Sequence, residues 1–172
     1  MHPLRPPTLP NWGKVEDGVY RCASSAPFAS VAQAKTLVPL GIRTVVCMWD
    51  GIPPWFGDFC GKEGIALVQK PLCGNKASSS DMDVGRVCDI LAVVCDSARH
   101  PVLVHCRSGK HRTGCVVGCL RKIQGWDEAT ILKEYVLFAG HKQRALDRAF
   151  IEDFDPALMK GRLAYVAHKP VW

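Results

Sequence analysis

Residues 105–114, HCRSGKHRTG, contain a cysteine and an arginine with five residues between them. A cysteine thiolate is a strong nucleophile, and the planar guanidinium group of an arginine can bind two oxygens of a phosphoryl group at once. A loop of this length can surround an oxyanion with backbone N–H groups while the arginine holds it from the far side. We therefore expect Cys106 to attack phosphorus and carry the phosphoryl group covalently, with Arg112 as the anion-binding residue.

The other residues of this segment have supporting roles in the same hypothesis. Gly109 allows a tight turn and a close approach of the backbone to the anion. Thr113 is expected to donate its hydroxyl hydrogen to the sulfur of Cys106, and His105 to order the loop by bonding to backbone. The residues of the loop that we expect to line the substrate site are Arg107, Ser108, Gly109, Lys110 and His111.

The flanking segments predict how this loop is held. Residues 101–104 are expected to form a buried strand, and residues 113–124 a helix that is apolar nearly all round. The free N–H groups and the positive dipole end of that helix would point at the bound anion and favour the thiolate. A cysteine at a strand end is usually a small buried apolar side chain. The accompanying histidine, glycine and Thr-Gly pair favour the catalytic interpretation.

The remaining pattern predicts a single α/β domain. Strands are expected at residues 18–21, 44–48 and 65–68, and helices at 25–37, 55–61, 81–95, 128–139 and 142–154. Strands with intervening helices, followed by helices only, indicate a central, mostly parallel sheet flanked by helices. We assign this domain to residues 11–156, after an N-terminal arm at 1–10 and before a C-terminal tail at 157–172.

Composition limits the environment and the partners. Nine cysteines, an odd number without a Cys-x-x-Cys pair, and no apolar run at the N-terminus favour a reducing compartment, the cytoplasm or also the nucleus. No apolar segment is long enough to span a membrane, and no ligand pair has zinc spacing, so we expect no metal or other cofactor. The net charge of +6 favours an anionic partner. Because basic residues are spread along the chain, a small phosphorylated substrate is expected rather than nucleic acid.

The motif His-Cys-x-x-Gly-x-x-Arg-Thr-Gly resembles the signature of the cysteine-dependent protein tyrosine phosphatase superfamily. The longer run 109–115, GKHRTGC, resembles one branch, the plant and fungal atypical dual-specificity phosphatases. Similarity extends over roughly residues 11–155, including segments 11–12, 15–21 and 150–154. The resemblance implies a dual-specificity phosphatase type of fold. It also implies cleavage of the β-phosphate of inositol pyrophosphates, with activity on phosphotyrosine and other phosphoesters.

The general acid that protonates the leaving oxygen is expected on residues 71–83. The superfamily usually places an aspartate on a mobile loop there, and Asp81 and Asp83 are the two candidates, with Asp83 favoured by alignment to the family. Both are also ordinary residues for the start of a helix. Asp50 follows a tryptophan, as in a Trp-Pro-Asp loop, but it comes after a different strand and lacks the proline, so we set it aside.

Further basic residues bear on the choice of substrate. Lys76, Lys142 and Arg144 are ordinary surface charges individually, but around one anion site they favour a substrate with several phosphates. Family members commonly carry a basic residue at the position of Ser108, and Arg107 is expected to compensate for it.

Other functions remain open at this point. A dual-specificity or tyrosine phosphoprotein phosphatase would use the same residues in a shallower pocket. The intact Cys106, Arg112 and Thr113 argue against a catalytically silent phosphate-binding module. An arsenate reductase would need a resolving cysteine, whereas Cys115 and Cys119 are expected to face the core; a sulfurtransferase also uses a cysteine in an anion loop.

Overall fold

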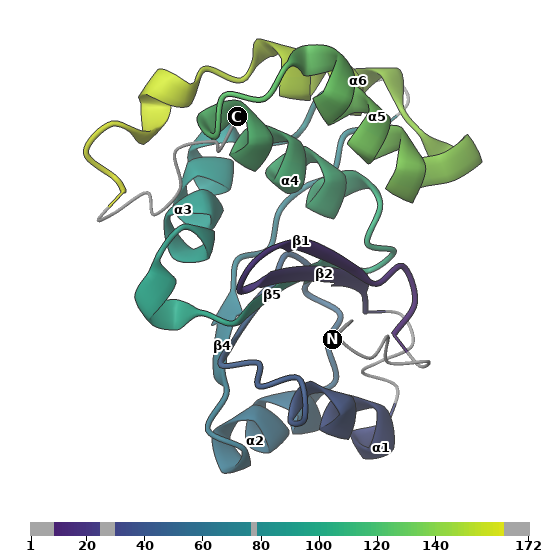
Figure 1. Ribbon diagram of the computed structural model, residues 1–172. Coiled ribbons are helices and arrows are strands. Elements are labelled where there is room, and N and C mark those ends of the chain that lie inside the picture. Colours follow the sequence, from purple (N-terminus) through teal and green to yellow (C-terminus); the bar gives the residue numbers. More distant parts are fainter. Residues whose placement is uncertain (1–8, 25–29, 77–78, 164–172) are drawn as a thin grey trace.

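The computed structural model describes residues 9–24, 30–76 and 79–163. A five-stranded sheet with the order β1-β2-β5-β3-β4 lies at its centre (Figure 1). The antiparallel pair is β1 with β2, and the other neighbouring strands are parallel. The strands are β1 Gly13–Glu16, β2 Val19–Ala23, β3 Thr44–Cys47, β4 Ala66–Gln69 and β5 Val102–Cys106. The predicted α/β domain with a mostly parallel sheet is confirmed.

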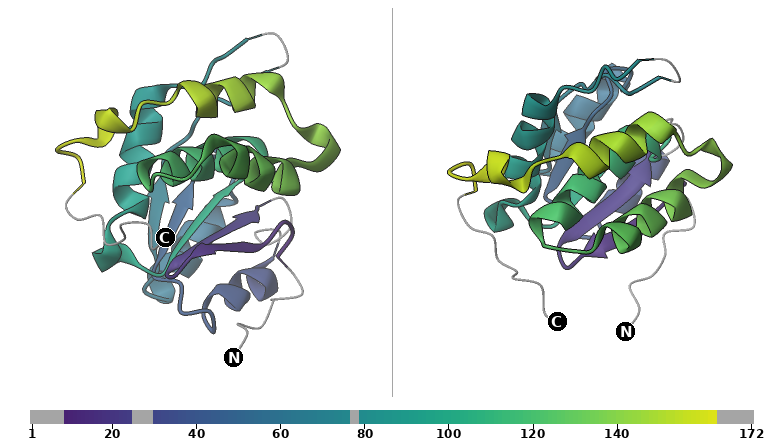
Figure 2. Two further views of the ribbon diagram at one scale, coloured as in Figure 1. Left: turned by 45° about the horizontal axis from the view of Figure 1, so that its top comes forward. Right: turned by 90° about the horizontal axis from the view of Figure 1, so that it is seen from above.

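Helices cover both faces of the sheet (Figures 1 and 2). On one face lie α1 (Val31–Ala34), which continues into a 3₁₀ turn (Lys35–Leu37), and α2 (Pro54–Lys62). On the other face lie α3 to α6, which are Val84–Val94, His111–Ile123, Glu128–Ala139 and Ala145–Asp153. All five residues of β5 are buried, as a strand covered on both faces requires.

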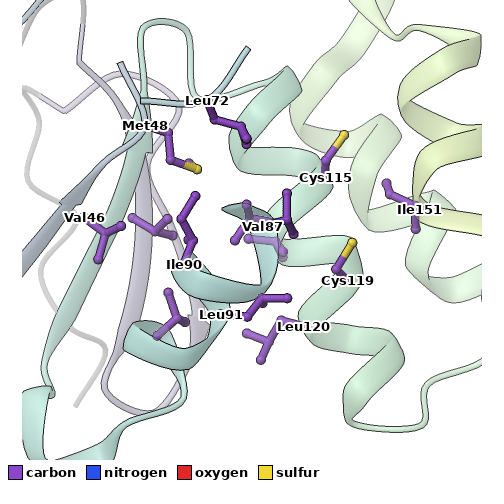
Figure 3. Packing of buried hydrophobic residues seen from close by; sticks show 14 of the residues in the cluster. Val46, Met48, Leu72, Val87, Ile90, Leu91, Cys115, Cys119, Leu120 and Ile151 are labelled. Carbon is purple, nitrogen blue, oxygen red and sulfur yellow. The ribbon is translucent and has the colours of Figure 1, made fainter. Parts of the chain in front are cut away.

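Alternate residues of β5 enter two separate hydrophobic cores. Leu103 belongs to the smaller core with α1 and α2, whereas Val102 and Val104 belong to the larger core with α3 to α6. Figure 3 shows the larger core, where Cys115 and Cys119 of α4 lie among apolar side chains. Both cysteines are 0% exposed, which confirms that they face the core.

Two glycines explain how α4 becomes the central helix. A Cβ on Gly114 would lie 2.7 Å from the ring of Tyr135, and one on Gly118 would lie 2.8 Å from Ile151. Glycine at both positions therefore allows α5 and α6 to pack directly against α4. This close packing places the beginning of α6 near the beginning of α4, where the cysteine loop ends.

Some boundaries differ from the predictions. The helix expected from Asp81 begins at Val84, because Asp83 is its N-cap and accepts a hydrogen bond from the N–H of Arg86 at 3.1 Å. The last long helix begins at Ala145 instead of residue 142, after a 3₁₀ turn at Gly140–Lys142.

The N-terminal half differs most. Strand β1 was not predicted, because its sequence GKVE contains a single large apolar residue. The expected helix at 25–37 is helical from Val31, and residues 25–29 lie outside the described part.

The ends of the chain are described in part. Residues 1–8 of the expected arm and 164–172 of the expected tail lie outside the described residues. A 3₁₀ turn, Pro156–Met159, follows α6, and Met159 is 1% exposed within the larger core. Packing therefore continues beyond residue 156.

Candidate active site

The cysteine loop connects the central strand to the central helix. Cys106 is the last residue of β5 and His111 the first of α4, so the strand, loop and helix follow the predicted order. Cys106 is 1% exposed and lies in the wall of a cleft of about 990 Å³. The cleft is lined by Asp50, Pro71, Leu72, Cys73, Gly74, Asp81, Asp83, Arg86, Cys106, Arg107, Ser108, His111, Arg112, Lys142 and Arg144.

Two residues hold the backbone of this loop from outside. The side-chain amide of Asn11 donates to the carbonyls of Ser108 at 3.3 Å and Gly109 at 3.0 Å. Arg21 donates to the carbonyl of Gly109 at 2.9 Å. In a trans peptide the N–H points away from the C=O. Carbonyls fixed outward therefore leave the following N–H groups on the opposite side, toward a bound anion.

Gly109 is required by this geometry, as predicted. Its φ is +65°, and a Cβ would lie 2.7 Å from the backbone of Cys22. Any other residue would strain the backbone and push the loop away from β2.

Arg21 also supplies a buried positive charge. Its side chain is 0% exposed and stacks on Phe138, with its Cζ atom 3.7 Å from the ring centroid. Burial lowers the pKa of Arg21 to about 10, and the charges of Glu134 and Cys106 act in the opposite direction. Arg21 is therefore still a cation at neutral pH, and it lies near enough to the sulfur of Cys106 for the two groups to interact electrostatically.

Arg112 is fixed by the strand ends beside it. Its Nη1 atom donates to the carbonyls of Met48 at 3.0 Å and Leu72 at 3.3 Å. Gly74 lies against its side chain, since a Cβ there would be 3.6 Å from Cγ of Arg112. One nitrogen thus anchors the guanidinium group, and the other donors are left for an anion in the cleft.

The expected contact from Thr113 is not formed. Its side chain is 0% exposed, and its hydroxyl has no hydrogen-bond partner among the residues that the structure describes. Helix α4 already begins at His111, so Thr113 lies inside the first turn and not at its start. The predicted bond to Cys106 is therefore corrected by the structure.

His105 gives the protein a specific acid sensitivity. Burial, reinforced by the charge of Arg112, lowers the pKa of His105 from 6.5 to about 3. Below pH 6.5 the His105 imidazole therefore binds a proton in the unfolded chain, whereas in the folded chain it stays neutral down to about pH 3. From this residue alone, we expect the free energy of unfolding to fall by about 2 kcal/mol between pH 7 and pH 5. Urea unfolding at both pH values measures the change.

The control for this prediction is His105→Gln, which cannot titrate. Other groups contribute equally to both proteins, so the difference between their pH slopes isolates His105. Equal slopes would show that burial of this imidazole is not coupled to folding.

The two predicted acid candidates both line the cleft, with different local bonds. Asp83 caps α3, whereas Asp81 accepts a hydrogen bond from Ser79 at 2.8 Å and lies 4.0 Å from Lys76. The side chain of Lys76 is 76% exposed and lies outside the cleft wall, and its contact with substrate stays a prediction.

Asp50, which the sequence argument set aside, also lines the cleft. The reason is strand order. β3 lies directly beside β5, with Cys47 opposite His105, so the segment after β3 meets the loop after β5. Its position shows that following a different strand does not remove a residue from this site.

Most of the predicted basic residues do surround the cleft. Arg107, His111, Lys142 and Arg144 line it with Ser108, whereas Lys110 and Gly109 are not in its wall. Arg86, on the first turn of α3, is an additional cation that sequence reasoning missed. Its spacing from Asp83 could have indicated that both face the same side.

Comparison with known proteins identifies the family of this chain. The model of the tyrosine phosphatase family matches residues 6–168. The chain belongs to the tyrosine phosphatase family. Asn11 and Arg21, which hold the loop, lie within the matched range, as do all the described residues of the cleft.

Curated relatives of this chain include two plant proteins. Inositol diphosphatase DSP1 of Oryza sativa subsp. japonica is 40% identical over 151 residues, which cover 87% of this chain and 66% of the relative. Inositol diphosphatase DSP3 of Arabidopsis thaliana is 39% identical over 153 residues, which cover 88% of this chain and 72% of the relative. The match thus spans about two thirds of the length of these relatives.

Solved structures agree with the family assignment. The core catalytic domain of the PP-IP phosphatase SIW14 from S. cerevisiae, in complex with citrate, matches with a TM-score of 0.78 and 32% identity. The match covers 90% of this chain and 92% of that domain. TpbA of P. aeruginosa has a TM-score of 0.70 at 22% identity, which shows the shared fold.

Further features of the chain concern metals, membranes and thiols. Within residues 9–24, 30–76 and 79–163, no group of three or more His, Cys, Asp or Glu side chains could hold a metal ion. None of the described helices is long and apolar enough to cross a membrane. All nine cysteines, which lie in the described ranges, have free thiols.

Proposed function

We propose that this protein is a cysteine-dependent phosphatase that hydrolyses the β-phosphate of inositol pyrophosphates through a phosphocysteine intermediate. The observation that carries the proposal is the cationic wall around Cys106. Arg86, Arg107, Lys142 and Arg144 line the same cleft as the nucleophile, in addition to Arg112. These charges suit a substrate with several phosphates better than one with a single phosphate. The names of the plant and yeast relatives support the same substrate class.

The reaction has two displacement steps. In the first step, the Cys106 thiolate forms a bond to the β-phosphorus, and the bond from that phosphorus to the bridging oxygen breaks. The inositol phosphate leaves with the electron pair of that bond. Arg112 and the loop N–H groups bind the equatorial oxygens, where negative charge accumulates. In the second step, water attacks phosphorus, the sulfur–phosphorus bond breaks, and inorganic phosphate is released with the thiolate restored.

Proton donation to the leaving oxygen is a separate proposal, and Asp81 and Asp83 are its two candidates. We expect Asn substitution of the acid to lower kcat on phenyl phosphate by roughly 10²-fold and on p-nitrophenyl phosphate far less, because a good leaving group needs no proton. Asp83→Asn is a sharp test, since asparagine also caps helices well and so preserves α3. Asp58→Asn, an exposed carboxylate on α2 outside the cleft, is the matched control. Unchanged rates in both candidate variants would exclude both residues.

A turnover assay with three substrates tests the proposed function. The wild-type protein is given a diphosphoinositol polyphosphate, a phosphotyrosyl peptide and a small aryl phosphate under reducing conditions, with Cys106→Ser as the blank. We expect kcat/KM to be highest, by orders of magnitude, on the inositol pyrophosphate. A preference for the peptide would instead indicate a phosphoprotein phosphatase. Turnover of none of them would indicate a phosphate-binding module.

The variant Lys142→Ala tests whether the basic residues of the cleft wall cause a preference for the inositol pyrophosphate. It should lower kcat/KM on the inositol pyrophosphate more than on the aryl phosphate, which is too small to reach the rim. Lys133→Ala, an exposed charge on α5 outside the cleft, is the matched control. If both lysine variants behave alike, the cleft charges do not select the substrate.

A further inference from the structure

Behind the cleft wall lies a buried carboxylate that sequence reasoning did not single out. Asp147, in the first turn of α6, is 0% exposed. Its Oδ2 atom accepts hydrogen bonds from Tyr135 at 2.8 Å and from Nδ1 of His111 at 2.9 Å, and its Oδ1 atom accepts one from Asn75 at 3.2 Å. Burial alone raises the pKa of Asp147, but these bonds outweigh it and hold the pKa below its ordinary value. Asp147 is therefore ionised at neutral pH.

The bond from His111 links Asp147 to the loop that carries Cys106. His111 lies directly before Arg112, its side chain is 13% exposed, and it lines the cleft. An ionised carboxylate can only accept hydrogen bonds, so Nδ1 of His111 carries the proton in this pair. With Nδ1 engaged at the back, Nε2 is the ring nitrogen left for contact with a substrate in the cleft.

The bond from Asn75 links Asp147 to the segment that carries the acid candidates Asp81 and Asp83. Asn75 is 0% exposed, and its Oδ1 atom accepts hydrogen bonds from the N–H of Met82 and the hydroxyl of Ser80, both at 3.2 Å. These contacts lie on either side of Asp81. The same amide that binds Asp147 thus folds this loop into place.

The bond from Tyr135 links Asp147 to Arg144, one of the basic residues that line the cleft. Tyr135 donates to Asp147, and its oxygen accepts a hydrogen bond from the backbone N–H of Arg144 at 3.0 Å. The guanidinium group of Arg144 in turn donates to the carbonyl of Asn75. Three segments that line the cleft, far apart in sequence, therefore converge on one carboxylate.

We propose that Asp147 is a positioning residue for catalysis, which acts through His111 by holding its ring so that Nε2 contacts the substrate. The bonds to Asn75 and Tyr135 connect Ser80, Met82 and Arg144 to the same carboxylate. The proposal deepens the function proposed above, because the substrate atoms that Nε2 would contact are phosphate oxygens.

A double-mutant cycle tests whether Asp147 acts through His111. Asp147→Asn keeps the shape of the side chain but replaces one acceptor oxygen with an NH2 group. That NH2 group must face other donors, either Asn75 or the pair of Tyr135 and His111, and so breaks the bonds on that side. We expect this substitution to lower kcat/KM roughly 30-fold in the wild-type background and less than threefold in a His111→Ala background. An equal loss in both backgrounds would show a merely structural carboxylate and overturn the proposal. Tyr135→Phe removes one bond to the same oxygen and the acceptor of the Arg144 N–H but leaves the pair with His111, so its effect on kcat/KM should not depend on the His111 background.

The intact protein offers a second test, which stands even if Asp147→Asn fails to fold. Nitrogen-15 NMR of the imidazole rings reports which nitrogen of His111 is protonated. The proposal requires a protonated Nδ1, and a ring that is protonated at Nε2 alone would overturn it.

Both tests are independent of the natural substrate. The cycle is run on a small aryl phosphate as well as on the inositol pyrophosphate. Failure of the proposed function would appear as a wild-type enzyme that does not prefer the inositol pyrophosphate. Failure of the positioning role would appear as an equal effect of Asp147→Asn in the wild-type and His111→Ala backgrounds, with both substrates.

Discussion

Cys106→Ser is expected to lower kcat by a factor on the order of 10⁴ or more on every substrate. A serine hydroxyl is a much weaker acid than a thiol, so serine supplies far less of the anionic nucleophile. The structure adds two reasons why the loss should be this large. The buried cation of Arg21 interacts with the Cys106 sulfur, and Cys106 itself is 1% exposed, so no other nucleophile easily takes its place. Substrate binding should persist, because Arg112 and the loop backbone are unchanged.

Steady-state kinetics and calorimetric binding on the same variant separate these effects. Rapid acid quenching should also trap a phosphorylated wild-type protein and no phosphorylated variant. The matched control is Cys95→Ser, at the C-terminal end of α3, opposite to the end that meets the cleft. Wild-type turnover by Cys106→Ser would refute the covalent mechanism.

Arg112→Lys should lower kcat by roughly 10² to 10³, although it preserves the charge. One nitrogen of Arg112 is occupied by the carbonyls of Met48 and Leu72, and the others are left to bind the phosphoryl group. A lysine has a single nitrogen, so it can satisfy the two carbonyls or the phosphate, but not both geometries. The loss should fall on kcat more than on KM, because the equatorial oxygens gain charge in the transition state.

The measurement is kcat and KM on an aryl phosphate for the variant and for Arg107→Lys. Arg107 lines the same cleft but is exposed, and no anchoring bond fixes it among the described contacts. Its substitution should therefore cost much less. Similar losses in both variants would mean that positive charge, and not the fixed guanidinium geometry, supports the reaction.

Most of the fold was predictable because its signals are local. The buried strand before Cys106 and the helix after it follow from residue types within a short segment. The helix at 128–139 was placed correctly, and Asp127 is its N-cap, which accepts a hydrogen bond from the N–H of Thr130. Strand β1 was missed because an edge strand with one buried residue has little apolar pattern.

The walls of the site were only partly predictable. Asp147 lies on an amphipathic helix between Leu146 and Arg148, where an acidic residue is ordinarily a surface charge. Its burial depends on how α6 packs over α4, which in turn depends on Gly118 meeting Ile151. Asp50 entered the cleft because β3 pairs with β5, and the order of strands in a sheet is not the order in the chain.

The sequence by itself determined the candidate nucleophile, the arginine and the turn between them. Covalent geometry keeps ten consecutive residues together whatever the rest of the chain does. The tertiary structure decided which groups surround them. The anchors of Arg112, the outer bonds of Asn11 and Arg21, and the convergence of His111, Asn75 and Tyr135 on Asp147 all join residues distant in sequence. Such contacts arise from the packing of whole elements, and no local pattern encodes them.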